Sequence, residues 1–490
     1  MIPADEIAVP ARGALEGVVR VPSSKSLTHR ALALAALANG PSVIEDPLVS
    51  DDTVRMARAL RTLGVRMEWA GQGGRVFEAA LDGGGIPASG IGRDPGADKS
   101  REDRAPWCAV QVEGRGGSFG ETAVALDAGG SGTAMRFLTA LASLASGDVI
   151  VDGSARLRER PVGPLVDALG MLGIKARSLA APGFPPIRVR GGGFDGGTAH
   201  VPGSMSSQFV SALLLVAPLA RGPALIEVLP PLVSAPYVDL TLRLMKAFSI
   251  TPSAWNEPHG QAMRPRGGAS TAASAEPGGP ALVYRFPGGG SYRPVRYQVP
   301  PDASAAGYFF AAAAVTGGRV RVEGVRRDDP QGDALLVDYL EAAGCTVRED
   351  TRGTTVAGPA DGCLRAFDLD LGPTPDLAPT LGVLAMFADG VCRIRGAAHL
   401  RLKESDRIAA VTAGLARLGA GVEETPDGFR ITPACSGYRG ARIETYDDHR
   451  VAMAFAVAGL VVPGVRIANP ACVAKSFPGF WEALFALRVA

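Results

Sequence analysis

The strongest constraint on the fold is a unit that recurs six times along the chain. Each copy is a polar turn followed by a helix-length apolar run that ends at or near glycine. The six copies are Val21–Gly40, Ala128–Gly147, Gly203–Gly222, Pro301–Gly317, Pro375–Gly390 and Tyr446–Gly464. Because these helices are apolar on nearly every side, each must be buried on every side. The turns supply helix-capping side chains, and the glycines end the helices.

A second class of helix is expected between these copies. Six segments carry charge on one face and Leu, Val or Ala at helical spacing on the other, which is typical of a half-exposed helix. They are Asp51–Leu63, Pro161–Leu172, Tyr237–Phe248, Gln331–Ala343, Ser405–Leu418 and Pro478–Leu487. Short β-type runs are Gly17–Val21, Ser42–Ile44, Val149–Val151, Ile187–Val189, Ala224–Val228, Arg319–Val322, Val391–Ile394 and Val465–Ile467. The repeated unit is therefore a strand, a buried helix, a strand, an amphipathic helix and further strand.

The spacing of the copies predicts two similar domains. Three of the five intervals between successive copies are 72–74 residues, which is longer than a common solenoid repeat and indicates a small α/β fold in each copy. The two longer intervals contain Gly-rich segments, near residues 83–120 and 256–294, which we interpret as loops or partly disordered insertions. Three copies lie on each side of the second segment. A cleft between two domains is a usual place for a small ligand.

Composition restricts the functions open to the chain. Its 490 residues are 47% hydrophobic and 20% charged, as in an ordinary globular protein, and the net charge of +1 gives no overall basic field for nucleic acid. The six cysteines are scattered without a CxxC pair and are interpreted as reduced core thiols. No apolar run is long enough to span a membrane, and the first residues lack a targeting signal. The chain is therefore expected in the cytoplasm.

Ionic residues gather at the polar turns, where closure of two domains would bring them together. The cations are Lys25, Arg30, Arg136, Arg156, Arg158, Arg160, Lys403, Arg407, Arg450 and Lys475. Each alone could be a solvated surface side chain, but their number suits a substrate with several phosphate or carboxylate groups. Asp376 and Glu404 could transfer protons once they are desolvated near these cations. The alternatives are a helix cap for Asp376 and a first-turn dipole partner for Glu404.

Two further patterns bear on ligands. The run Ser204, Ser206, Ser207 and Gln208 offers neutral donors for a phosphate, or only a helix cap. The segment Gly129–Thr133 is Gly-rich but lacks the Lys-Ser/Thr ending of a P-loop, so ATP binding is not indicated. The five histidines are spread too widely to predict a metal site from their spacing.

Nine motifs then point to one family. In chain order they are PSSKSLTHR, GSGTAMR, RLRERPVGPLVDAL, GSMSSQF, LVSAPY, PDLAPT, RLKESDR, DDHRVAM and AKSFPGF. With them the chain resembles the 5-enolpyruvylshikimate-3-phosphate synthases over nearly its whole length outside the two insertions. The resemblance implies transfer of the enolpyruvyl group of phosphoenolpyruvate to the 5-hydroxyl of shikimate 3-phosphate, with release of phosphate, through a tetrahedral intermediate. It implies no metal or organic cofactor, and a monomer whose partners are these two small molecules.

The resemblance also implies an architecture. Each of two domains would contain three βαβαββ units around a pseudo-threefold axis, an inside-out α/β barrel, with the active site in the cleft between the domains. One domain would hold residues 23–299 and the other residues 1–22 together with residues 300–490. The chain would then cross between domains next to Lys25.

Functional residues carry over motif by motif. Lys25 matches a residue that touches both substrates, Asp376 the acceptor of the 5-hydroxyl proton, and Glu404 the group that protonates the methylene carbon. Positions matching contacts to shikimate 3-phosphate are Lys25, Ser26, Arg30, Ser206, Ser207, Gln208, Ser234, Asp376 and Lys403. Positions matching contacts to phosphoenolpyruvate are Lys25, Gly132, Arg156, Gln208, Arg407, Arg450 and Lys475. The absent side chain of Gly132 would leave room for phosphoenolpyruvate and for the inhibitor glyphosate.

Four positions depart from the family pattern. Gly130, Phe137, Ala235 and His399 replace residues frequent in the family, which bears on inhibitor response and affinity.

UDP-N-acetylglucosamine enolpyruvyl transferase shares the fold, but residues 148–164 contain no cysteine where that enzyme typically carries one. A non-catalytic binding protein on the same fold is the other alternative, and the presence of Asp376, Glu404 and the cations argues against it. The neutral net charge argues against a nucleic-acid-processing relative.

Overall fold

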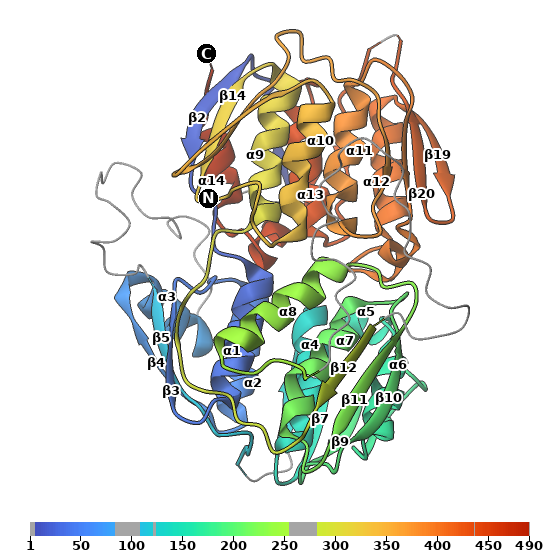
Figure 1. Ribbon diagram of the computed structural model, residues 1–490. Coiled ribbons are helices and arrows are strands. Elements are labelled where there is room, and N and C mark those ends of the chain that lie inside the picture. The colour runs from blue at the N-terminus through green and yellow to red at the C-terminus, as the bar shows by residue number, and fades with distance from the viewer. Residues whose placement is uncertain (1–4, 84–107, 121–123, 254–281, 436, 490) are drawn as a thin grey trace.

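The computed structural model describes residues 5–83, 108–120, 124–253, 282–435 and 437–489, and it forms two lobes stacked end to end (Figure 1). Each lobe has its own hydrophobic core. One core gathers residues from Leu27 to Val299, and the other combines Val9–Val21 with residues between Ala303 and Leu487. The fold is therefore a two-domain α/β fold, as the sequence predicts.

The first lobe contains three sheets. Its helices are α1 (Lys25–Leu37), α2 (Asp51–Thr62), α3 (Gly71–Leu81), α4 (Gly132–Leu141), α5 (Ala155–Arg158), α6 (Gly163–Met171), α7 (Ser207–Val216) and α8 (Ala235–Ala247). Its strands are β3 (Pro41–Glu45), β4 (Arg66–Ala70), β5 (Ala109–Glu113), β6 (Val124–Asp127), β7 (Asp148–Asp152), β8 (Ala176–Ser178), β9 (Ile187–Arg190), β10 (Gly197–Pro202), β11 (Ala224–Leu229), β12 (Leu282–Phe286) and β13 (Arg296–Gln298). The sheet orders are β13-β3-β5-β4, β6-β7-β9-β8 and β10-β11-β12.

The second lobe repeats this plan. Its α-helices are α9 (Ala303–Thr316), α10 (Leu336–Ala342), α11 (Ala378–Met386), α12 (Arg407–Leu418), α13 (His449–Gly459) and α14 (Phe480–Phe485), and its short 3₁₀ turns include η4 (Gly332–Leu335), η5 (Pro375–Leu377), η6 (Ala398–Leu402) and η7 (Pro470–Lys475). Its strands are β1 (Glu6–Ala8), β2 (Leu15–Val19), β14 (Arg319–Glu323), β15 (Thr346–Asp350), β16 (Gly353–Ala357), β17 (Asp368–Asp370), β18 (Cys392–Arg395), β19 (Gly421–Thr425), β20 (Gly428–Thr432), β21 (Arg442–Ile443), β22 (Arg466–Ala468) and β23 (Arg488–Val489). The sheet orders are β15-β16-β14-β2-β23, β17-β18-β20-β19 and β1-β22-β21.

The predicted βαβαββ unit is complete in the second and fifth copies. There β6 and β7 are parallel, β9 and β8 follow antiparallel, and β17, β18, β20 and β19 repeat the arrangement. In the first and fourth copies the opening strand comes from elsewhere in the chain, because β13 pairs with β3 and β2 pairs with β14, both in parallel. Among the described residues none of the six sheets closes on itself, so the sheets form open walls rather than a closed barrel.

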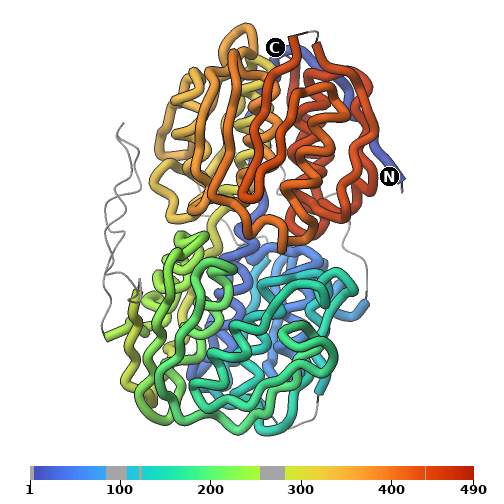
Figure 2. Tube along the Cα trace, turned by 90° about the vertical axis from the view of Figure 1, so that its right-hand side faces the viewer, coloured from blue at the N-terminus to red at the C-terminus, as the bar shows by residue number. Residues whose placement is uncertain are grey.

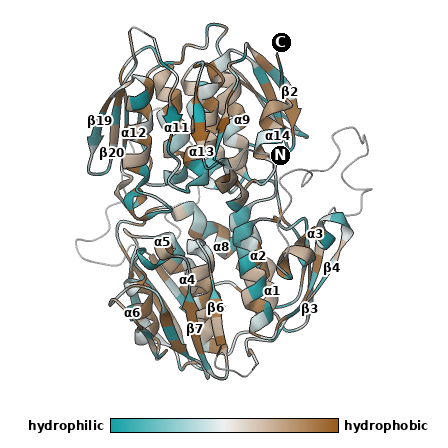
Figure 3. Cartoon of the chain, turned by 180° about the vertical axis from the view of Figure 1, so that it is seen from behind, coloured by the Kyte–Doolittle hydropathy of each residue, from teal (hydrophilic) through white to brown (hydrophobic). Residues whose placement is uncertain are grey.

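The six predicted apolar helices are confirmed as α1, α4, α7, α9, α11 and α13, and they lie inside the lobes. In the second lobe α9, α11 and α13 contact one another, and in the first lobe α4 contacts α1 and α7. The sheets lie outside them, and hydrophobic residues run through these central helices (Figure 3). Five begin at a capping Ser or Asp whose oxygen accepts a backbone N–H, and α11 instead continues from η5. Their starts point towards the other lobe (Figure 1).

The two crossings between the lobes run side by side. Ser24 N donates to Pro300 O at 2.8 Å, and Asp302 N donates to Pro22 O at 2.8 Å. Residues 5–22 thus belong to the core of the second lobe before the chain enters α1. Figure 2 shows this blue segment beside the red C-terminal part of the chain. The two cores support the domain boundaries expected from the sequence, which stay a prediction.

Both predicted insertions contain regular structure at one end, which corrects their interpretation as loops. Residues 109–113 form β5, in the middle of a sheet between β3 and β4, and residues 282–286 form β12, which pairs with β11. Each has alternating apolar residues, which the neighbouring Gly-rich sequence obscured. Residues 84–107 and 256–281 of the two predicted insertions lie outside the described residues. The helix Gly71–Leu81 was also not predicted.

Within the described residues, no helix is long and apolar enough to cross a membrane. The same part of the chain contains no group of three or more His, Cys, Asp or Glu side chains arranged to hold a metal ion.

Candidate active site

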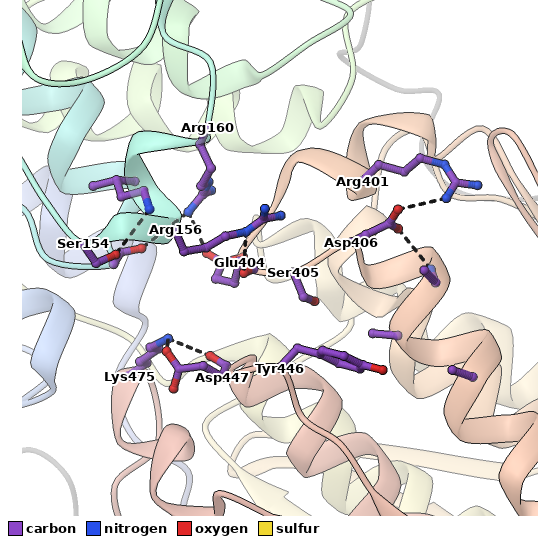
Figure 4. Close-up of a pocket in the computed structure, with 15 residues that line it drawn as sticks. Ser154, Arg156, Arg160, Arg401, Glu404, Ser405, Asp406, Tyr446, Asp447 and Lys475 are labelled. Carbon is purple, nitrogen blue, oxygen red and sulfur yellow. Dashed lines mark hydrogen bonds and ion pairs between the residues drawn. The ribbon is translucent and has the colours of Figure 1, made fainter. Parts of the chain in front are cut away.

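A cavity of about 670 Å³ opens where the two lobes meet. From the first lobe it is lined by the turn at Gly130 and by Arg156 and Arg160 around α5. From the second lobe it is lined by residues around the start of α12, by Tyr446 and Asp447, and by Lys475. In Figure 4 Arg156, Arg160 and Glu404 lie together at one end of this cavity, opposite Lys475 and Asp447. The polar turns predicted to converge therefore do meet at one cleft.

Arg407 connects three carboxylates beside the cavity, of which one is fully buried, that of Asp448, and those of Asp376 and Glu404 are partly exposed. Its Nη1 lies 2.7 Å from Asp376 Oδ1, its Nη2 2.7 Å from Glu404 Oε2, and its Nε 2.8 Å from Asp448 Oδ2. The guanidinium is almost completely buried. Burial would lower the pKa of Arg407, but the three carboxylates, Asp448 first, outweigh it and raise that pKa. Arg407 therefore stays charged and fixes the relative positions of the two proposed proton-transfer groups.

Asp376 is held by donors from both lobes. Arg450 Nη2 donates to its Oδ2 at 2.8 Å, and the Tyr237 hydroxyl of α8 donates to the same oxygen at 3.1 Å. Burial alone would raise the pKa of the Asp376 carboxyl, but Arg450 and Arg407 outweigh it and hold that pKa below its usual value. Asp376 does not cap a helix, because Thr374 precedes η5 and makes no capping bond. The helix-cap interpretation is therefore wrong.

Glu404 likewise faces cations from both lobes. Arg160 Nη1 lies 3.4 Å from its Oε1, in addition to the Arg407 contact. Arg156 donates to the backbone oxygens of Glu404, at 3.1 Å, and of Lys403, at 3.2 Å. Burial would raise the pKa of Glu404, but Arg160 and Arg407 hold it well below its usual value. Because α12 begins after its capping residue Asp406, Glu404 lies before the helix and is no first-turn dipole partner.

Lys25 approaches the cleft from the start of α1. Its Nζ lies 3.0 Å from Asp52 Oδ2, and its backbone N donates to Asp302 Oδ2 at 3.1 Å, next to the crossing between the lobes. Ser26 follows Lys25 in the first turn of α1. Lys475 lies across the cavity and donates to Asp447 O at 2.6 Å. Lys25 is therefore tied to both lobes, as its position beside the crossing implies.

A smaller cavity adjoins Arg160 and is lined by several residues predicted to bind shikimate 3-phosphate. Ser206, Gln208 and Lys403 line it together with His399. Ser206 also caps α7, accepting from Gln208 N at 3.2 Å, so the capping interpretation of this serine is correct at the same time. Burial lowers the pKa of Lys403, and burial together with Lys403 lowers the pKa of His399 to about 3.

Three predicted residues lie in less open positions. Ser207 is buried in the first turn of α7, and Ser234 is buried at the start of α8 with a φ of 55°. Arg30 is buried inside the first lobe, where it donates to Thr241 Oγ1 at 2.8 Å and to Tyr237 O at 2.9 Å. Its guanidinium also lies 5.4 Å from the Phe137 ring centre. In this structure Arg30 therefore supports α8 rather than lining either cavity.

Gly132 is closely surrounded by two arginine side chains. An added Cβ would lie 2.5 Å from Arg160 Nη2 and 2.9 Å from Arg136 Nη1. At the departure Gly130, by contrast, an added Cβ would lie 3.8 Å from Lys475 Nζ, an ordinary contact. Ala235, another departure, is the first residue of α8. The packing of the arginines therefore leaves no space for a side chain at Gly132, whereas Gly130 has space for one.

The sequence motifs do not predict the role of several residues of the cleft. They indicate Arg160 only as one cation among many, and they predict no role for Tyr237, Asp333 and Asp448. Asp448 is completely buried, and it accepts from Ser405 Oγ at 3.1 Å as well as from Arg407. The motif DDHR marks Asp448 as a residue of interest. It does not reveal the contact with Arg407, which lies 41 positions away in the chain.

Most of the chain matches the model of one protein family. The family model described as EPSP synthase (3-phosphoshikimate 1-carboxyvinyltransferase) matches residues 9–90, 93–267 and 283–484.

The chain belongs to the EPSP synthase family. Among its relatives, a 3-phosphoshikimate 1-carboxyvinyltransferase of Laribacter hongkongensis is 42% identical, and one of Thiobacillus denitrificans is 39% identical; each match covers 97% of both chains. An EPSP synthase structure from Acinetobacter baumannii superposes with a TM-score of 0.71 at 27% identity, covering 99% of this chain and 98% of that one. The family assignment predicted from the nine motifs is confirmed.

Proposed function

We propose that this chain is a 3-phosphoshikimate 1-carboxyvinyltransferase, which transfers the enolpyruvyl group of phosphoenolpyruvate to the 5-hydroxyl of shikimate 3-phosphate and releases phosphate. This is the transfer of the shikimate pathway, which leads to the aromatic amino acids. The family match over nearly the whole chain supports this activity. The observation that carries the mechanism is the pair Asp376 and Glu404, both bound by Arg407 at the junction of the lobes.

The first step would be an addition. The 5-hydroxyl oxygen of shikimate 3-phosphate attacks C2 of phosphoenolpyruvate, Asp376 accepts the hydroxyl proton, and Glu404 gives a proton to C3. The product is a tetrahedral intermediate that carries a methyl group at C2. Two carboxylates in one site can take opposite roles when their surroundings set their pKa values apart.

The second step would reverse the proton movement at carbon. Glu404 takes a proton back from the methyl group as the bond from C2 to the phosphate oxygen breaks, which restores the carbon–carbon double bond. The proton on Asp376 leaves with the departing phosphate. Glu404 takes up from solvent, when the substrates bind, the proton that it donates, and over the two steps it returns to that protonated state.

The cations have two tasks in this scheme. Arg156, Arg407, Arg450 and Lys475 would bind the charges of phosphoenolpyruvate, and Lys25 would lie between both substrates. In the absence of substrates Glu404 is held ionised by Arg160 and Arg407. Negative charge placed on these guanidiniums raises the pKa of the carboxyl beside them, which is the direction that proton donation requires. Substrate binding would thus prepare Glu404 for its role.

Several further assignments remain part of the proposal. Ser26, Arg30, Ser206, Ser207, Gln208, Ser234 and Lys403 would bind shikimate 3-phosphate, which for Arg30 requires its guanidinium to turn towards the cleft. The chain would act as a monomer in the cytoplasm and would use no metal or organic cofactor. Gly132 would leave room for phosphoenolpyruvate.

The test is a phosphate-release assay with phosphoenolpyruvate and one of two acceptors. Turnover with shikimate 3-phosphate, and none with UDP-N-acetylglucosamine, is expected. Turnover only with the sugar nucleotide, or with neither acceptor, would overturn the proposed function.

A further inference from the structure

Arg450 faces two carboxylates, and only one of them is part of the mechanism above. Its Nη2 lies 2.8 Å from Asp376 Oδ2, and its Nη1 lies 3.8 Å from Asp333 Oδ2. Asp333 belongs to η4, which packs against α9. A small shift of the whole guanidinium towards η4 would bring Nη1 onto Asp333 and draw Nη2 away from Asp376.

Asp333 faces Arg450 with one oxygen, Oδ2, and within the described part of the chain its other oxygen lacks a partner. Its Oδ2 accepts from Ser304 Oγ, while its Oδ1 has no hydrogen-bond partner among the described residues. The side chain is buried, with 3% of the residue exposed. A buried carboxylate oxygen without a partner is unfavourable, and such groups in native structures call for an explanation.

Asp376 accepts hydrogen bonds from three side chains, which weakens it as a proton acceptor. Arg450, Arg407 and Tyr237 all donate to it, so both of its oxygens are occupied. A carboxylate bound by two guanidiniums is a weak base, and losing one of them makes it a stronger one. Arg407 is anchored to Asp448, whereas Arg450 has Asp333 within reach.

We propose that Asp333 is a positioning residue that draws the Arg450 guanidinium away from Asp376 when the substrates bind, which frees Asp376 Oδ2 to accept the 5-hydroxyl proton. This inference rests on the proposed function, because it concerns the step in which Asp376 acts. Asp333 does not touch the reacting atoms in this scheme; it acts through Arg450.

The charge state of Asp333 decides whether it can hold Arg450. Burial raises its pKa to about 6, Arg450 opposes that rise, and Asp376 adds to it. The other groups facing it are Ser304, whose hydrogen bond lowers this pKa, and Asp302, which raises it. Asp333 also raises the pKa of the hydroxyls of Tyr237, Tyr308 and Tyr339, which stay protonated. Below about pH 6 Asp333 is neutral and cannot compete for the guanidinium.

The main variant is Asp333→Asn, which keeps the shape and removes the charge. We expect kcat to fall about 10²-fold, as for a misplaced catalytic group, with a much smaller change in KM for shikimate 3-phosphate. The unaltered chain is expected to lose kcat as the pH falls through about 6, and Asp333→Asn should not show this loss. The phosphates of the two substrates titrate in the same range, but they are common to both enzymes, so the difference between the profiles reports Asp333.

Two further variants separate positioning from folding. Asp329→Asn alters a carboxylate of the same segment that accepts from Gln331 rather than facing Arg450, and it should leave the profile unchanged. Ser304→Ala removes a hydrogen bond that lowers the pKa of Asp333, so the acid limb should move to higher pH. This second result does not depend on whether Asp333→Asn folds.

The outcomes are distinguishable from those of the functional assay. If the unaltered chain shows no turnover, the proposed function fails. If it turns over and Asp333→Asn keeps the same kcat and pH profile, or loses activity only together with its Tm, the inference is overturned. An acid limb that does not move in Ser304→Ala overturns it as well.

Discussion

Replacing Gly132 by alanine tests how closely the cations of the cleft are packed. Gly132 is the first residue of α4, after the capping Ser131, and an added Cβ would lie 2.5 Å from Arg160 Nη2 and 2.9 Å from Arg136 Nη1. Both arginines are buried. Because the interior is close-packed, an ordinary contact requires these guanidiniums to move by about 1 Å. Arg160 Nη1 is already 3.4 Å from Glu404, so this movement threatens a contact to a proposed catalytic group.

The expected loss follows from that displacement. A misplacement of about 1 Å can cost about 10²-fold in rate, which corresponds to about 2.7 kcal/mol of transition-state stabilisation. We therefore expect kcat/KM for phosphoenolpyruvate to fall about 10²-fold, with a smaller rise in KM for shikimate 3-phosphate, because Arg136 and Arg160 also line the smaller cavity. Alanine is favoured over glycine in a helix by up to about 1 kcal/mol, which offsets part of the overpacking cost of about 1–3 kcal/mol, so Tm should fall only slightly.

The assay is phosphate release with each substrate varied at saturation of the other, together with a thermal melt. Gly170→Ala is the matched control, because an added Cβ on Gly170 of α6 meets nothing within 4 Å. Unchanged kcat/KM for phosphoenolpyruvate in Gly132→Ala would refute the argument from packing. An equal loss for both substrates with a much lower Tm would show a general defect in folding instead.

Two other predictions concern proton transfer and stability. Asp376→Ala and Glu404→Ala should each lower kcat by about 10²–10⁴-fold and keep binding of shikimate 3-phosphate in calorimetry; near-normal rates in both variants would contradict their roles. Burial lowers the pKa of His29 from 6.5 to about 4, against the opposing effect of Asp52, so folding excludes the protonated form. The resulting stability is present above pH 6.5 and is lost as the pH falls towards 4, and His29→Gln should reduce that loss by about 2–3 kcal/mol. Urea unfolding at pH 7.5 and 4.5 measures it, and an equal pH dependence in the variant would rule the explanation out.

The sequence predicts the helices well and the sheets less completely, for a physical reason. An apolar helix such as α9 is recognisable from its own residues, because burial on all sides demands apolar residues at every position. A strand such as β5 is five residues long, and its pairing with β3 and β4 depends on distant parts of the chain. The parallel pairing of β2 with β14 across some 300 residues has no local signal at all.

The same distinction holds at the cleft. Motifs locate Asp376, Glu404 and Arg407 as chemically suitable residues, but they do not say which side chain meets which. The bond from Tyr237 to Asp376 joins α8 of one lobe to η5 of the other, and the facing of Arg450 and Asp333 joins residues more than one hundred positions apart. Such contacts follow from how the lobes dock, which no single motif encodes.

The place of β1 and β2 in the second lobe has a consequence for synthesis. The strand β2 is made among the first 20 residues, yet the neighbours that it pairs with are β14, which begins at Arg319, and β23, which begins at Arg488. The first lobe is complete once β13 has been made, whereas the sheet of β2 in the second lobe cannot be completed until β23 has left the ribosome. The strand β2 is therefore made hundreds of residues before either of the strands that it pairs with. A cut near residue 300 would leave the following half without β1 and β2, so the lobe that looks C-terminal cannot be expressed complete from the C-terminal half alone.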